Sequence, residues 1–184
     1  SLMKSIVDGR FFCANIWEFL GQNFKAVIGT AIIHHHDFIR SFFIEDDRFS
    51  KTIIILTEYN KTSVSGLIIN RDTTKQLEIN NIQNDIKFKI KHGGPVEIDN
   101  ICFIHNIPHL LIGGRLIYDN FYFGGDLNEV IDNTQKKQGD DSNILFFSGY
   151  VGWNTTQLKQ EIKEGSWILF HQHIDIFNNH ISWA

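Results

Sequence analysis

Residues 147–158 read FSGYVGWNTTQL, and this stretch carries the strongest signal for the fold. An apolar strand is predicted over 144–149, followed by a turn that holds Gly149 and Gly152. A helix is then predicted over 154–164, because apolar residues recur there at helical spacing. A strand, a turn and a helix in this order are typical of a domain that combines both kinds of secondary structure.

The predicted turn allows two interpretations. Glycines permit a close backbone approach, and a helix N-terminus offers free N–H groups to a phosphate or carboxylate. Alternatively, the glycines only let Tyr150 and Trp153 pack, and Asn154 satisfies the helix end as its cap. Gln157 and Glu161 lie four residues apart on one helix face, so they predict either a polar binding site, with Glu161 as a base, or a solvated surface.

The remaining elements follow from apolar runs and turn residues. Strands are predicted over 26–33, 52–56, 64–70, 88–91, 101–105, 115–118 and 167–170, and helices over 11–24 and 126–137. The run 52–56 is predicted to be buried on both faces and to form a hairpin with the strand that follows. The polar stretch 72–86 predicts a short helix or an irregular connection. Because strands and helices do not alternate regularly, we expect a mixed sheet with helices outside it.

The helix over 126–137 carries a capping pattern. Asp126 precedes it and Glu129 lies three residues on, as in a capping box. Its inner stripe is predicted to consist of Leu127, Val130, Ile131 and Thr134.

Composition narrows the classes of function. The 184 residues include 17 Lys and Arg against 21 Asp and Glu, a net charge of -4. Strong nucleic-acid binding is therefore not expected, because it depends on neutralising phosphates. Lys87, Lys89, Lys91 and His92 form a local basic strand face, which predicts either such a contact or an ordinary solvated surface.

The cysteine count and the apolar runs indicate in which cellular compartment the protein is expected. Cys13 and Cys102 stand far apart and form no CxxC pair, which predicts free thiols in a reducing compartment. No apolar run reaches the roughly 18 residues that span a membrane, and the first ten residues lack the apolar block of a secretory signal. We expect a cytoplasmic protein with no membrane association.

Three further groups of residues are candidates for chemistry. Asn70 and Arg71 end a buried strand, and Arg71 is expected to meet either an anionic ligand or an internal carboxylate. Gly93 and Gly94 precede a proline in a sharp turn whose amides are able to line an anion site. The run His34-His35-His36-Asp37 has poor geometry for a metal, because neighbours on a strand point to opposite faces; it would need His171 and His173 as further ligands. We therefore predict no metal and no cofactor. No Ser-His-Asp set, GxSxG or HExxH is present.

Three blocks in this order and spacing resemble the YqgE/AlgH family: 65–71 (SGLIINR), 93–96 (GGPV) and 147–153 (FSGYVGW), with Gln157, Leu158, Glu161, Ile162 and Trp167 after them. The resemblance extends from about Gly29 to Trp183. It implies an α+β fold, a single domain with a mixed, partly barrel-like β-sheet flanked by helices, in a bacterial cytoplasmic protein. It also implies an uncharacterised function: some members are labelled transcriptional regulators, and no catalytic residues are established. On this basis residues 1–25 are assigned to an N-terminal arm or helix and 26–184 to the YqgE/AlgH-like domain.

Three functional hypotheses remain open. The first is a regulatory or binding protein, not an enzyme, that acts through a protein partner rather than through strong DNA binding. The second is an enzyme or sensor for a small anionic ligand, held by Arg71 and the helix start at Asn154, with Glu161 or His92 as acid or base. The third is a structural or assembly role, with the aromatic tail 177–183 and the Phe-rich N-terminal arm as partner surfaces. The candidate cleft consists of Asn70, Arg71, Gly93, Gly94, Gly149, Tyr150, Gly152, Trp153, Asn154, Gln157 and Glu161.

Overall fold

The structure is a computed structural model that describes residues 38–41, 46–79, 86–135, 142–170, 174–177 and 181. The predicted helix 11–24, the strand 26–33, the His34–His36 run, His171 and His173 lie outside the described residues, as does the boundary near residue 25. Within the described part the strands form one ten-stranded sheet.

The strands and helices occur in the following order. They are β1 (Phe38–Ser41), β2 (Ile53–Tyr59), β3 (Ser63–Ile68), β4 (Asp72–Ile79), β5 (Ile86–His92), β6 (Val96–His105), β7 (Arg115–Tyr118), β8 (Phe121–Phe123), α3 (Leu127–Gln135), β9 (Ile144–Asn154), α4 (Thr155–Lys163) and β10 (Trp167–Phe170).

Strand β9 holds the sheet together, because it has different neighbours along its length. Its first half pairs parallel with β5 and antiparallel with β6, and its second half pairs antiparallel with β3. The main path runs β10-β1-β2-β3-β9-β6-β8-β7, with β4 and β5 branching from β9. One parallel pair among antiparallel pairs makes the sheet mixed, and it curls into a nearly closed barrel, which confirms the predicted fold class.

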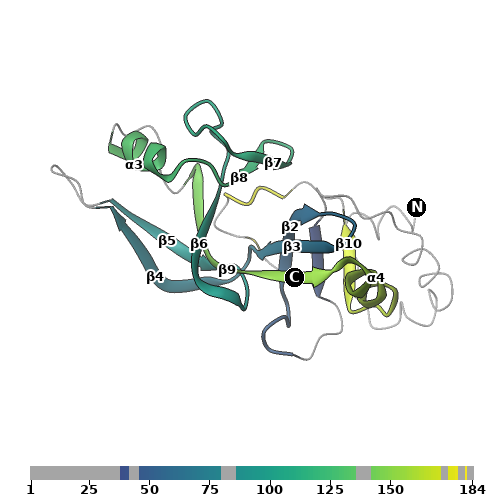
Figure 1. Cartoon of the computed structure of the whole chain (residues 1–184). Coiled ribbons are helices and arrows are strands. Elements are labelled where there is room, and N and C mark those ends of the chain that lie inside the picture. The colour runs from purple at the N-terminus through teal and green to yellow at the C-terminus, as the bar shows by residue number, and fades with distance from the viewer. Residues whose placement is uncertain are drawn as a thin grey trace, which may run out of the picture.

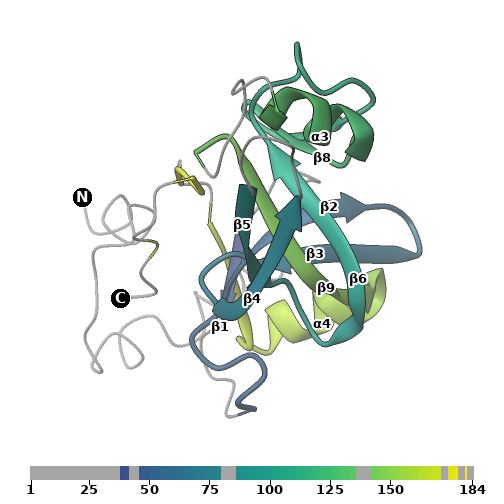
Figure 2. The same cartoon turned by 90° about the vertical axis from the view of Figure 1, so that its left-hand side faces the viewer.

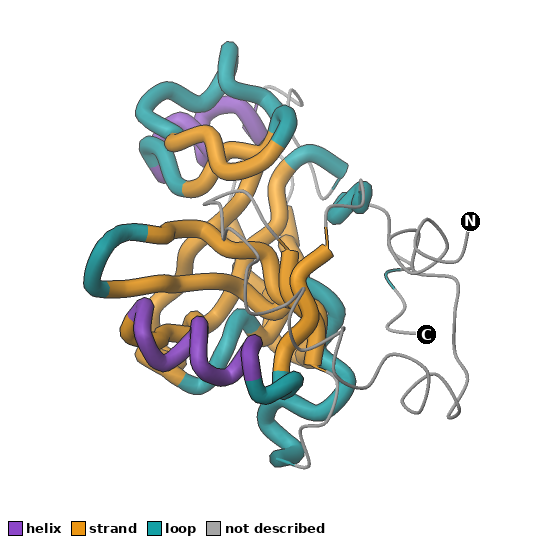
Figure 3. The backbone as a smooth tube through the Cα atoms, turned by 90° about the vertical axis from the view of Figure 1, so that its right-hand side faces the viewer, coloured by secondary structure: helices purple, strands orange, loops and turns teal. Residues whose placement is uncertain are grey.

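The helices lie at opposite ends of the strand body (Figures 1 and 3). Helix α4 buries Leu158 and Ile162 against β3, β9 and β10, and both residues face inward as the sequence predicts. Helix α3 is seen beside β6 and β8 in Figure 2, and its Val130 is fully buried against the other face of β9. A separate apolar cluster fills the barrel interior between β2, β3, β6 and β9.

Three predictions on local structure are wrong. Residues 72–79 form the edge strand β4 rather than a helix or irregular connection, because backbone pairing with β5 stabilises a stretch with few apolar residues. Strand β9 does not end at Gly149 but continues to Asn154, since β3 supplies a new partner from Val151 onward. The predicted turn is thus a kink within a strand, where Gly149 has a φ of 70°.

The start of α3 is only half as predicted. Asp126 Oδ1 accepts the N–H of Asn128 at 2.8 Å, as expected of a cap. The Glu129 carboxylate, however, accepts the N–H of Ile112 at 2.5 Å and so ties the helix to the preceding loop. Leu127 was predicted to face inward, but it is 49% exposed, because it lies at the first position of the helix, beyond the reach of the core.

Candidate functional site

A groove of about 690 Å³ lies where β9 bends between its two sets of neighbours. This volume is in the range of small-molecule and peptide sites. The predicted site residues that line it are Gly149, Tyr150, Gly152, Trp153, Asn154 and Gln157. They share the groove with residues of β2, β3, β6 and β8: Thr57, Glu58, Ser63, Val64, Ser65, Leu67, Val96, Glu97, Asn100, Cys102 and Phe123.

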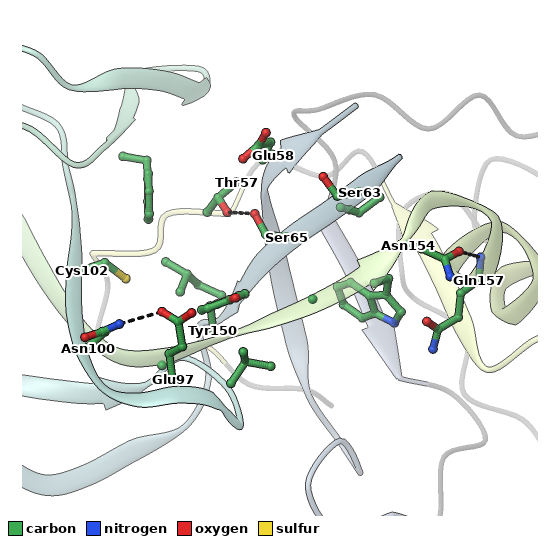
Figure 4. A pocket seen from close by; sticks show the side chains of 17 residues that line it. Thr57, Glu58, Ser63, Ser65, Glu97, Asn100, Cys102, Tyr150, Asn154 and Gln157 are labelled. Carbon is green, nitrogen blue, oxygen red and sulfur yellow. Dashed lines mark hydrogen bonds between the residues drawn. The ribbon is translucent and has the colours of Figure 1, made fainter. Parts of the chain in front are cut away.

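The groove is the mouth of the barrel. Because side chains alternate along a strand, the residues of β2 and β3 that face the interior are Ile53, Ile55, Leu67 and Ile69. The same faces continue outward as Thr57 and Ser65, whose hydroxyl oxygens lie 3.1 Å apart in a hydrogen bond (Figure 4). The groove is therefore apolar deep inside the barrel and polar at its opening. Ligand sites at the mouths of β-barrels commonly combine an apolar lining with a few polar groups.

The charge of the groove is negative. Glu58 and Glu97 contribute carboxylates, each of which accepts one amide hydrogen bond: Asn60 donates to Glu58 at 3.0 Å and Asn100 to Glu97 at 2.6 Å. Glu97 has a φ of 49°, which a non-glycine residue rarely adopts. Among the described residues that line the groove there is no lysine, arginine or histidine.

Among the described residues that line the groove, Cys102 carries a thiol. Burial raises its pKa to about 11. Since the thiolate is the nucleophile, this cysteine stays protonated and unreactive near neutral pH.

Gly93 and Gly94 lie behind the groove rather than in its lining. The turn between β5 and β6 crosses β9 so closely that a Cβ on Gly93 would collide with the carbonyl of Gly149, and one on Gly94 with the backbone of Tyr150. The Gly93 N–H also donates to the carbonyl of Ser148 at 2.9 Å. These glycines therefore permit two backbone segments to touch and so fix the kink that shapes the groove.

Asn70 and Arg71 do not line the groove and lie at the opposite end of β3 from Asn154. The register places Asn154 beside Ser63, and β3 alone extends about 17 Å from Ser63 to Ile68. The structure therefore does not bring Arg71 and Asn154 together as an anion site.

The Arg71 guanidinium has backbone partners in place of a carboxylate or ligand. It donates to the carbonyls of Asp47, Arg48 and Ser50 at 2.6, 2.8 and 3.0 Å. Asn70 joins the same turn, since its Nδ2 donates to the Lys51 carbonyl at 2.9 Å and its Oδ1 accepts the Ile53 N–H at 2.8 Å. This pair anchors the turn before β2.

Glu161 is enclosed by hydrogen-bond donors. Its Oε2 accepts the indole N–H of Trp153 at 2.9 Å and that of Trp167 at 2.8 Å, and its Oε1 accepts from Gln157 Nε2 at 2.8 Å. The two indole rings meet edge to face, with centroids 5.6 Å apart. Glu161 thus fastens α4 to β9 and β10, and its oxygens are already engaged.

The start of α4 is capped as predicted. The Asn154 side chain accepts the N–H of Gln157 at 2.7 Å. This bond occupies one of the amides that an anion would use.

The basic strand face is partly neutralised by its neighbour. Lys87 pairs with Glu78 and Lys91 with Asp72, both at 2.7 Å and both across the β4–β5 ladder. Within the described part of the chain, no group of three His, Cys, Asp or Glu side chains could hold a metal ion. The described helices include none long and apolar enough to cross a membrane.

Sequence reasoning missed Thr57, Ser65, Glu58, Glu97 and Asn100. The local pattern does not mark Thr57 or Ser65, because the runs 53–56 and 66–69 consist of apolar residues and glycine without alternation, and the pairing of β2 with β3 is irregular between Leu56 and Glu58. Nothing in the local sequence marks Glu97 or Asn100, because they reach the groove only through the irregular pairing of β6 with β9.

A family model described as AlgH-like matches residues 38–183. The chain belongs to the AlgH-like family. A UPF0301 protein of Chlorobium phaeobacteroides is 33% identical over 134 residues, 71% of each chain. A UPF0301 protein of Parabacteroides distasonis is 31% identical over 134 residues, 70% of this chain and 67% of that one. These names state no activity.

Two solved structures show that the AlgH-like fold is shared. AlgH of Pseudomonas aeruginosa superposes with a TM-score of 0.58 at 23% identity and covers 76% of this chain and 77% of that one. Protein DIP2367 of Corynebacterium diphtheriae gives 0.59 at 16% identity, with 80% and 85% covered. At these identities the likeness concerns the fold alone.

Proposed function

We propose that this AlgH-like protein is a non-enzymatic regulatory protein of the cytoplasm that binds a protein partner through the groove at the barrel mouth. The observation that carries the proposal is a preformed groove whose described lining combines an apolar floor, hydroxyls, amides and two carboxylates. Such a lining offers recognition without an activated nucleophile, because its thiol remains protonated.

The surroundings of the groove favour binding over chemistry. Glu161, the candidate base, already accepts three hydrogen bonds from side chains of its own fold. A general base must reach the substrate proton directly or through one water. Regulation of transcription through DNA contact receives no support from the groove, whose charge is negative, and the pairing of Lys87 and Lys91 reduces the positive field of the β5 face.

Gly152→Leu provides a test. Gly152 is exposed, and a Cβ at this position would meet only the edge of the Tyr150 ring, at 3.4 Å, so the leucine fills the groove without straining the backbone. The wild-type protein and the variant are used as baits for proteins of the source bacterium, with thermal unfolding as the check on folding. A partner that the wild type retains and Gly152→Leu loses supports the proposal, whereas equal retention by both baits contradicts it.

Small molecules are tested in parallel by thermal unfolding against nucleotides, sugar phosphates, divalent metals and short DNA. A ligand at about 100 times its dissociation constant stabilises by roughly 2.7 kcal/mol. We expect no shift with any of these. A shift with one anionic compound that Gly152→Leu abolishes would replace the protein partner with a small ligand.

A further inference from the structure

Two strands that border the groove have open outer edges in the part of the chain that the structure describes. Strand β8 pairs with β6 only at Ile104 and His105, and β1 pairs with β2 only as far as Ile55. In the described part of the chain, the first half of β6 and the last part of β2 therefore have no strand on their outer edges. Both edges border the groove, since Glu97 and Cys102 of β6 and Thr57 of β2 line it.

The outer edge of β6 presents backbone groups for pairing. The Phe103 carbonyl points to that edge, where it accepts the N–H of Gly124 at 2.9 Å. In an antiparallel ladder the direction of the backbone groups alternates with each residue. Ile101, two residues away, therefore points its N–H and carbonyl to the same outer edge.

Apolar side chains are exposed along this half of β6. Val96, Ile98 and Ile101 are 37%, 49% and 44% exposed. An uncovered edge with apolar residues is a template for another strand, and proteins normally protect such edges. The charged residues of this stretch, Glu97 and Asp99, are both acidic, and its pairing with β9 is irregular between Val96 and Ile101, so the regular part of the open edge begins at Ile101.

The two carboxylates at the groove favour a partner segment with positively charged side chains. In Figure 4 the Glu97 side chain rises from β6 beside Tyr150, and Glu58 lies at the opposite rim. Without a cation in the described lining, the two carboxylates complement a lysine or arginine placed between them.

We propose that the groove takes an extended, lysine- or arginine-bearing segment of the partner protein, which pairs with the outer edge of β6 as an added strand. Backbone bonds to Ile101 supply the register, and the carboxylates of Glu58 and Glu97 hold the cationic side chains on the groove face of the added strand. The alternate apolar side chains lie on its opposite face, beside the exposed Ile101. This proposal rests on the proposed function and names the chemistry of the partner.

The experiment measures binding of a fluorescent peptide of alternating lysine and valine, blocked at both ends, to the full chain. Two control peptides accompany it: one with glutamate in place of lysine, and one with the same lysines but with N-methyl groups on the amides of one edge. The protein variants are Glu58→Gln/Glu97→Gln, Ile101→Pro and, as a control that also removes a distant carboxylate, Asp132→Asn on the exposed face of α3.

We expect the lysine peptide to bind and the glutamate peptide not to bind. The double variant should weaken binding about tenfold, because it removes both carboxylates that pair with the cationic side chains, and Asp132→Asn should change nothing. Ile101→Pro and the N-methylated peptide should each abolish binding, because both remove backbone pairing and leave the charges in place. Proline is tolerated where an edge N–H points outward.

Several results would overturn the proposal. Equal binding of the lysine and glutamate peptides would refute the charge preference, and unchanged binding of the N-methylated peptide would refute strand addition. A dimer in solution that Ile101→Pro converts to a monomer would assign the edge to a second copy of this chain. If Gly152→Leu abolishes partner capture while the peptides fail to bind, the groove is functional and only the strand mode is wrong; if neither result appears, the proposed function fails as well.

Discussion

His105 is a buried histidine whose ring makes an incomplete set of hydrogen bonds. Its Nδ1 accepts the N–H of Ile107 at 3.3 Å, and its ring stacks on Tyr122 with centroids 5.5 Å apart. Its Nε2 is buried beside the Gly124 carbonyl, and among the described residues it forms no hydrogen bond of good geometry. Since Nδ1 is an acceptor, the neutral ring carries its proton on Nε2. Burial lowers the pKa of His105 below its usual 6.5, because the charged form loses its hydration.

This lowered pKa predicts acid sensitivity. The unfolded chain binds a proton at His105 near pH 6.5 and the folded protein does not, so stability is full above that pH and falls as the pH decreases below it. Urea unfolding at a series of pH values measures the slope of the free energy of unfolding against pH. His105→Gln, which replaces the titrating ring with a neutral amide, should flatten it.

His92→Gln is the matched control for this prediction. The His92 pKa is also lowered, by burial and by the nearby Arg71 and Lys75 charges, but this side chain is only half-buried. We expect His92→Gln to change the pH dependence of stability less than His105→Gln does. An unchanged slope in His105→Gln would show that His105 is not the titrating group.

Arg71 is a second residue whose contacts within the fold predict how its substitution changes stability. Arg71→Ala removes the donors to three backbone carbonyls, so we expect the free energy of unfolding to fall by about 2 kcal/mol. Arg71→Lys should not restore it, because an ammonium does not reproduce the planar fork of donors. Binding of the lysine peptide in the groove should be unchanged. A loss of binding in a folded Arg71→Ala protein would show that Arg71 contributes to the binding site.

At the scale of elements, α4 is attached to the sheet by both apolar and polar contacts. Leu158 and Ile162 supply the buried surface, and Glu161 joins the indole N–H groups of Trp153 and Trp167. Removing the carboxylate leaves two buried donors unpaired, and each unpaired donor costs about 1–3 kcal/mol.

Glu161→Ala should therefore destabilise the protein by about 2–6 kcal/mol, with a change in tryptophan fluorescence before global unfolding. Glu164→Ala removes the same charge from the exposed end of the same helix and should have little effect. Equal stability of the two variants would mean that the carboxylate does not fasten the helix.

At the scale of the whole molecule, one backbone crossing joins the two halves of the sheet. The turn after β5 touches β9 at Gly149, where the strand kinks and changes its partners from β5 and β6 to β3. Packing that is this close cannot accept a side chain without moving a strand. The groove, the barrel mouth and the path of β9 therefore all depend on this crossing.

Gly93→Ala should lower the free energy of unfolding by about 3 kcal/mol or prevent folding. Gly152→Ala, on the same strand as Gly149 but with space for a Cβ, should be close to neutral. Chemical denaturation of both variants measures the difference. A tolerated alanine at Gly93 would indicate that the two halves of the sheet are able to separate slightly without loss of stability.

The sequence by itself determined the local structure of this protein where apolar patterning is strong. The local sequence is enough to specify the buried strand at 53–56, the hairpin that follows, the strand beginning at Ile144 and the capped helix α4. The residues of the kinked strand that line the groove were also identified, because their glycines and aromatic residues form a distinctive local pattern.

Only the tertiary structure decided which of these residues meet. Local sequence does not encode that β3 takes over pairing from Val151 onward, so a strand was mistaken for a turn. It also does not encode that Arg71 and Glu161 find partners within the fold, or that Glu58 and Glu97 face one groove. These outcomes depend on contacts between residues far apart in the chain, which form only when the whole sheet curls and its interior excludes water.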